Sequence, residues 1–139
     1  MATTPIDRMT ATLDFQATTL SLQAQRAKVL ASNIANADTP NYQARDFDFN
    51  QALSQATQAT SQNPAAPART HPAHLSTTGT AAPAPVLQYR QPTQAALDGN
   101  SVDLDTERAA FAENSIRYEA SLRFLNGQIK TMLTAINGQ

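Results

Sequence analysis

The sequence predicts a mainly α-helical fold in which two long terminal helices form an antiparallel, coiled-coil-like pair. A small irregular or β middle segment with a mobile Pro/Ala/Thr loop joins them. Apolar residues recur every seven positions over residues 5–38 and again over residues 103–137. Six of the eight prolines lie between residues 51 and 100, where only three side chains are charged. Such a middle region cannot sustain a long helix and offers little to bury.

Length and composition limit the classes of protein. A chain of 139 residues is long enough for one domain, but only 6% of its residues are aromatic and much of its apolar content is alanine. A net charge of −1 gives no electrostatic reason to bind nucleic acid or an anionic membrane. No stretch approaches the ~18 apolar residues of a membrane span. The N-terminus lacks the apolar core of a signal peptide. Composition alone therefore predicts a cytosolic protein.

The N-terminal helix is predicted over residues 5–38. One apolar line recurs every seven residues, at Ile6, Leu13, Leu20, Ala27 and Ile34. A second line, three places later, begins at Met9 and ends at Leu30 and Ala37, but Gln16 and Gln23 interrupt it. A helix of this length would be a rod of about 50 Å. Because one helix cannot hide so long an apolar edge by itself, it needs a partner.

The C-terminal helix is predicted over residues 103–137 with the same pattern. One line recurs at seven, at Leu104, Phe111, Tyr118, Leu125 and Met132, and a second follows at Leu122, Ile129 and Ile136. Asp103 is suited to cap the first turn. The apolar pattern is strongest in the C-terminal half, where the tightest packing is expected.

The middle segment, residues 39–102, contains two short pieces that favour extended structure. Residues 46–49 alternate in polarity like a strand, and residues 86–90 are a second candidate. If these pieces pair, they form a small hairpin and not a sheet domain. Residues 54–86 are predicted to be a flexible loop.

The candidate catalytic and metal sites are weak. His71 and His74 are three residues apart, but Pro72 between them disfavours a helix that would let them share a metal. Residues 98–107 superficially resemble a calcium loop, yet the fifth and sixth positions are Val102 and Asp103, which do not fit it. We expect no active site, no cofactor and no metal.

Asn33 and Asn36 lie where the first helix should end. One interpretation is that they finish the helix, since asparagine amides bond to nearby backbone. Pro40 then turns the chain, because it disfavours the α conformation at Thr39. The other interpretation is functional: the turn fixes where the middle segment leaves the helix, and the two asparagines contact a neighbouring subunit.

The whole segment 31–42 closely resembles the N-terminal motif of the bacterial flagellar rod, hook and hook–filament junction proteins. In that family an Asn-(Ile/Leu)-Ala-Asn core precedes Thr-Pro-Gly-Tyr, and here Asn41 takes the place of the glycine. The motif residues are Asn33, Asn36, Thr39, Pro40 and Tyr42. Segments 44–49, 71–75 and 89–107 further resemble the proximal-rod members of the family.

The resemblance implies a non-enzymatic structural subunit of the flagellar proximal rod, required for flagellum assembly and motility. Such a protein is exported through the type III apparatus without a cleaved signal peptide and assembles in the periplasm, which overturns the cytosolic expectation. Its implied partners are neighbouring rod subunits, the rod-base protein FliE, FlgC-like rod proteins and the export gate, with neither nucleic acid nor direct membrane insertion. The terminal helices of such proteins tend to be disordered before assembly.

The predicted assembly interface follows from the apolar lines of both helices. It comprises Leu13, Leu20, Leu30, Ile34, Phe111, Tyr118, Leu122, Leu125, Ile129, Met132 and Ile136. The alternative function is a soluble helical adaptor or export chaperone that binds partners without entering a polymer. An enzyme using His71 or His74 is a third hypothesis.

Overall fold

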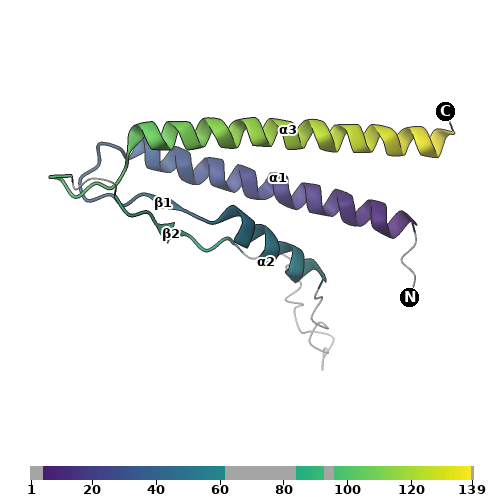
Figure 1. Cartoon of the computed structure of the whole chain (residues 1–139), viewed down its shortest axis with the longest axis horizontal. Coiled ribbons are helices and arrows are strands. Elements are labelled where there is room, and N and C mark those ends of the chain that lie inside the picture. The colour runs from purple at the N-terminus through teal and green to yellow at the C-terminus, as the bar shows by residue number, and fades with distance from the viewer. Residues whose placement is uncertain (1–4, 62–83, 93–95, 139) are drawn as a thin grey trace, which may run out of the picture.

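The described part of the chain is elongated and consists of three helices and a two-stranded sheet. The computed structural model describes residues 5–61, 84–92 and 96–138. In chain order the elements are α1 (Pro5–Ala35), β1 (Arg45–Asp46), α2 (Phe49–Ser61), β2 (Gln88–Tyr89) and α3 (Leu104–Asn137). Figure 1 shows α1 and α3 running antiparallel along the long axis, with α2 and the strands on the opposite side of α1 from α3.

The two terminal helices are in contact, so the predicted helical pair is confirmed. We call the end where α1 finishes and α3 begins the junction end, and the opposite one the terminal end. Asp103 caps α3 as expected, since its side chain accepts hydrogen bonds from the backbone N–H groups of Asp105 and Thr106. At the terminal end, Gly138 closes α3 in the left-handed conformation.

The middle segment contains a helix that the sequence analysis missed. Residues 54–61, predicted as the start of a flexible loop, belong to α2, whereas residues 62–83 lie outside the described part of the chain. Asp48 begins the helix, because its side chain accepts a hydrogen bond from the Gln51 N–H. Ala52 and Ala56, one turn apart, then pack against α1.

The two short extended pieces pair in a small two-stranded sheet, with α2 in the connection between them. β1 and β2 are antiparallel, with Arg45 opposite Tyr89 and Asp46 opposite Gln88. The strand predicted over residues 46–49 is shorter and shifted, because Phe49 already belongs to α2.

The hydrophobic core is small and lies between α1 and α2. It comprises Leu22, Phe47, Ala52 and Ala56, with Phe49 and Leu53 packed against it. Within the described residues, no helix is long and apolar enough to cross a membrane.

Candidate functional site: a polar junction and an exposed apolar face

Asn33 of α1 is fully buried and forms hydrogen bonds with both β1 and α3. Its Nδ2 donates to the Arg45 carbonyl at 2.7 Å, and the Arg45 N–H donates to its Oδ1 at 3.1 Å. This pair of bonds occupies the backbone groups of β1 much as a neighbouring strand would. Nδ2 also donates to Glu107 Oε2 of α3 at 3.1 Å. Asn33 therefore ties β1 to both long helices, a role beyond finishing its own helix.

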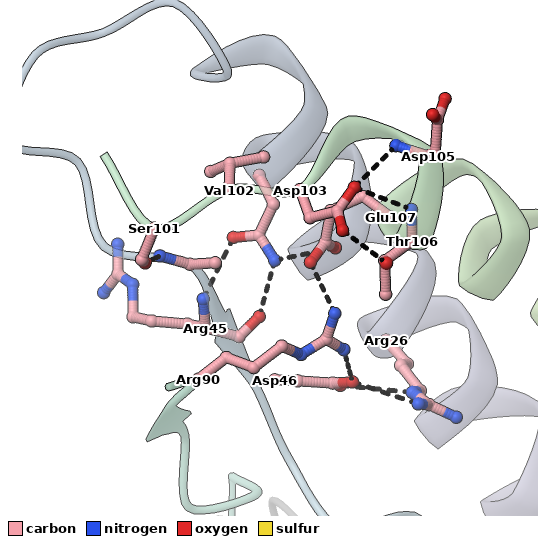
Figure 2. A network of polar contacts seen from close by, with 12 residues as sticks. Arg26, Arg45, Asp46, Arg90, Ser101, Val102, Asp103, Asp105, Thr106 and Glu107 are labelled. Atoms are coloured by element: carbon pink, nitrogen blue, oxygen red, sulfur yellow. Dashed lines mark hydrogen bonds and ion pairs between the residues drawn. The ribbon is translucent and has the colours of Figure 1, made fainter. Parts of the chain in front are cut away.

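Four charged side chains complete this site, as Figure 2 shows. Arg26 of α1 binds Asp46 through two hydrogen bonds of 3.1 and 3.0 Å. Arg90 lies between the carboxylates of Asp46 and Glu107 and donates to both. The two cations balance the two anions, which compensates the complete burial of the Glu107 side chain. We call Arg26, Asn33, Asp46, Arg90 and Glu107 the polar junction.

The electrostatics of the Arg26–Asp46 pair favour its charged forms. Burial alone would raise the pKa of Asp46, but the hydrogen bonds from Arg26, the Phe47 N–H and Arg90 outweigh it, so that pKa lies below its ordinary value. The hydrogen bond to Asp46 in turn raises the pKa of Arg26. These ion pairs hold together α1, the strands and α3.

The turn that follows α1 is held by a residue that the sequence pattern did not indicate. The buried Asn100 donates from Nδ2 to the carbonyls of Asn36, Ala37 and Thr39, at 3.0, 2.7 and 3.0 Å. Asn36 itself makes local bonds, donating from Nδ2 to the Ser32 carbonyl at 2.8 Å. The carbonyls of the turn after α1 are thus satisfied from a segment more than sixty residues away in sequence.

The turn after α1 is closed by two left-handed residues. Asn41 has φ 60° and Gly99 has φ 72°, and the Asn41 N–H donates to the Asp98 carbonyl at 2.9 Å. Asn41 thus adopts the conformation expected of a residue in the place of the family's glycine. Residues 98–103 form this turn and the cap of α3, and the described part of the chain holds no cluster of three or more His, Cys, Asp or Glu side chains. His71 and His74 lie outside the described residues.

The residues of the predicted interface divide between the interior and the surface. Leu30 is buried, and six others are partly buried: Leu13, Leu20, Ile34, Phe111, Leu125 and Met132. The rest are exposed, together with Leu133, which the prediction omitted. We define the apolar face of α3 as Tyr118, Leu122, Ile129, Leu133 and Ile136, with exposed fractions from 38% to 75%. Their spacing of four, seven, four and three places them on one side of the helix.

The expectation of tightest packing in the C-terminal half of α3 is wrong. The buried residues of this helix are Glu107 and Asn114, both near the junction end, and none between 115 and 138 is buried. Asn114 donates to the main-chain carbonyl of Gln23 at 2.9 Å. The sequence pattern was misleading because polar residues, and not the second apolar line, face α1.

Comparison with known proteins identifies the chain. A family model described as "Flagella basal body rod protein" matches residues 13–43, which cover most of α1 and the turn after it. The flagellar basal body rod protein FlgB of Escherichia coli (strain K12) is 48% identical over 135 residues, 94% of this chain and 96% of the relative. The chain belongs to the FlgB family.

Other members of the FlgB family are similar over comparable lengths. The FlgB protein of Salmonella typhimurium is 44% identical over 96% of this chain and 98% of its own length. That of Aeromonas hydrophila is 44% identical over 86% of this chain and 88% of its own length. The resemblance to flagellar rod proteins is thus confirmed, and the family-model match contains Asn33, Asn36, Thr39, Pro40 and Tyr42.

Proposed function

We propose that this chain, as a FlgB-family protein, is a structural subunit of the flagellar proximal rod with no catalytic role. It polymerises through its terminal helices as part of the axial drive shaft and export channel. Residues 5–38 and 103–137 act together as one axial helical domain, and residues 39–102 form the middle segment.

The observation that carries this proposal is the uncovered apolar face of α3. Its side chains include Ile129 and Ile136, which are 41% and 75% exposed. Burying an aliphatic side chain of this size is worth roughly 1.5–3 kcal/mol. A contiguous row of such residues is typical of a protein–protein contact. We infer that neighbouring rod subunits cover this face and that Leu13, Leu20 and Leu30 of α1 belong to the same assembly interface.

The polar junction gives the subunit a fixed geometry at one end. Because its ion pairs join α1, both strands and α3, they determine where the middle segment leaves the helical pair. A rod that transmits torque needs its subunits to hold one shape, and these paired charges supply that constraint.

Membership of the family supports a more detailed proposal for the partners and the location. The neighbours would be other rod subunits, the rod-base protein FliE and FlgC-like rod proteins, above the type III export gate. The chain would reach the periplasmic rod through that gate, without a cleaved signal peptide. Its small core is compatible with export in an unfolded state, since little buried apolar area must be exposed to unfold it.

Fractionation separates this function from that of a soluble adaptor or export chaperone. The tagged chain is expressed in a bacterium that lacks its own FlgB, and hook–basal bodies are purified. A rod subunit restores motility and co-purifies with them after detergent and alkaline washes. Recovery of the chain in the soluble fraction alone, with motility restored, would favour the adaptor.

A further inference from the structure

The two-stranded sheet has two faces with different surroundings. Side chains alternate between the faces of a strand, so Asp46 and Arg90 lie on the face that belongs to the polar junction. Arg45 and its cross-strand partner Tyr89 lie on the opposite face, together with Leu87. All three side chains are exposed, and Figure 2 shows Arg45 pointing away from the polar junction. We call Arg45, Leu87 and Tyr89 the outer face of the sheet.

The outer edge of β2 leaves main-chain groups unpaired. The Arg90 N–H donates to the Ala44 carbonyl at 2.9 Å, so Gln88 and Arg90 direct their main-chain groups at β1. The N–H and carbonyl groups of Leu87 and Tyr89 therefore face away from β1. Among the described residues, β2 contacts no helix or strand except β1, and none bonds to these main-chain groups. Such an edge is a template for a further strand.

The opposite edge of the sheet is closed by the fold itself. There the Arg45 N–H and carbonyl face away from β2, and both bond to the buried side chain of Asn33. The sheet can therefore be extended only along β2.

The surface beside the outer face is partly apolar and positively charged. An open pocket of about 190 Å³ is lined by Lys28, Val29, Tyr42, Arg45 and Leu87 among others. It is smaller than the ~300 Å³ of an ordinary small-molecule site, which leaves room for a single side chain. Lys28 and Arg45 form no ion pair with any residue that the structure describes. Two unpaired cations next to exposed apolar side chains favour a partner that carries a carboxylate beside an apolar residue.

We propose that an extended, acidic segment of a neighbouring polypeptide adds a third strand to the sheet along the outer edge of β2. Its main chain bonds to Leu87 and Tyr89, its apolar side chains pack on these two residues, and its carboxylate pairs with Arg45. A second copy that pairs through its own β2 fits less well, because Arg45 and Lys28 of both copies would share one surface. The inference rests on the proposed function, but it adds a contact separate from the apolar face of α3.

Photo-crosslinking from position 89 in assembled hook–basal bodies tests the added strand. A benzophenone amino acid replaces Tyr89, and mass spectrometry maps the residues that it joins. The expected adduct lies in another polypeptide, in a segment of alternating apolar residues that contains an aspartate or glutamate. An adduct to β2 of a second copy, or to a segment without an acidic residue, overturns the inference. If position 129 gives an intersubunit adduct and position 89 gives none, the added strand is refuted while the rod function stands.

Two substitutions at position 87 separate main-chain pairing from side-chain contact. Leu87→Pro removes an N–H on the free edge and none of the bonds between β1 and β2, whereas Leu87→Ala removes the side chain and keeps that N–H. The crosslink yield from position 89 should fall by about ten-fold in Leu87→Pro and by about three-fold or less in Leu87→Ala. Equal melting temperatures of the two isolated variants show that the fold is kept. If both variants crosslink equally well, no strand pairs with β2.

Arg45→Glu tests the charge of the partner. The Arg45 side chain is exposed and outside the ion pairs of the polar junction, so the melting temperature of the isolated chain should not change. The crosslink yield from position 89 should fall by about ten-fold, because a carboxylate would then face a carboxylate. An unchanged yield would refute the acidic character of the added strand.

Discussion

Asn33 and Asn36 belong to the same short motif, but their surroundings give them different roles. Asn33 is fully buried and contacts β1, α3 and the Tyr42 hydroxyl. Asn36 is partly exposed and bonds within its own turn, to Ser32 and Thr39. The free energy of unfolding lost when each side chain is removed should increase with the number of buried polar groups that the removal leaves without a hydrogen bond.

Asn33→Ala is expected to lower the free energy of unfolding by about 2–3 kcal/mol, because the Arg45 N–H and carbonyl and one Glu107 oxygen lose their partner together. Asn36→Ala serves as the comparison and should cost about 1 kcal/mol or less. Urea denaturation followed by circular dichroism gives both values. If the two variants lose the same free energy of unfolding, the hydrogen bonds of Asn33 to β1 and α3 do not stabilise the fold.

Two glycines should respond in opposite ways to alanine. Gly99 has φ 72°, and an added Cβ would lie 2.7 Å from Asn41 Oδ1, so Gly99→Ala should cost about 1–2 kcal/mol. Gly127 lies within α3 with no atom near an added Cβ, so Gly127→Ala should stabilise by about 0.4–1 kcal/mol. Thermal melts of the two variants check the signs, and a stabilising Gly99→Ala would refute the tight turn.

At the scale of elements, the helices were predictable where their own sequence carries the signal. The seven-residue recurrence and the Asp103 cap predicted α3 to within a residue of its observed start. The helix α2 was missed because its neighbourhood is rich in proline, although Asp48 followed by Ala52 and Ala56 was a usable signal. The polar junction was not predictable, since no periodicity links Arg26, Asp46 and Glu107.

The polar junction should make stability depend on pH through Asp46. Its pKa lies below the ordinary value of 3.8, so the stabilising charge is fully present above that value. The contribution is lost as the pH falls through the lower pKa of the folded state. Asp46→Asn removes the charge at every pH and should be destabilising at pH 6.

The test is the difference in urea midpoint between the natural chain and Asp46→Asn, measured from pH 6 down to pH 3. The difference should shrink as the pH falls, because protonated Asp46 then resembles asparagine. Asp105→Asn is a suitable control, as Asp105 is exposed and outside the polar junction. If the difference in urea midpoint stays constant across this range, the contribution of Asp46 to stability does not come from its charge.

At the scale of the whole molecule, α3 uses two sides for different purposes. Glu107, Asn114 and Ser121 bond to α1, while the apolar face of α3 remains uncovered. The sequence revealed which residues are apolar and how they recur. It could not reveal which line faces α1, because that choice depends on the bonds of Glu107, Asn114 and Ser121 to groups on α1.

This division predicts different outcomes for two aspartate substitutions, four residues apart. Ile129→Asp should block incorporation into the rod and leave the fold of the isolated chain unchanged, because Ile129 is exposed. Leu125→Asp should also block incorporation but lower the melting temperature, since Leu125 is partly buried. Lys130→Gln, on an exposed position beside Ile129, changes the net charge by the same amount and should still incorporate.

The most direct test of the proposed role is photo-crosslinking from position 129 in assembled hook–basal bodies. A benzophenone amino acid replaces Ile129, and the crosslinked products are identified by mass spectrometry. We predict an adduct between this position and another rod subunit, with a much weaker yield from position 121, which faces α1. An assembled rod that contains the chain but gives no intersubunit adduct from position 129 would contradict the proposed role of the apolar face of α3.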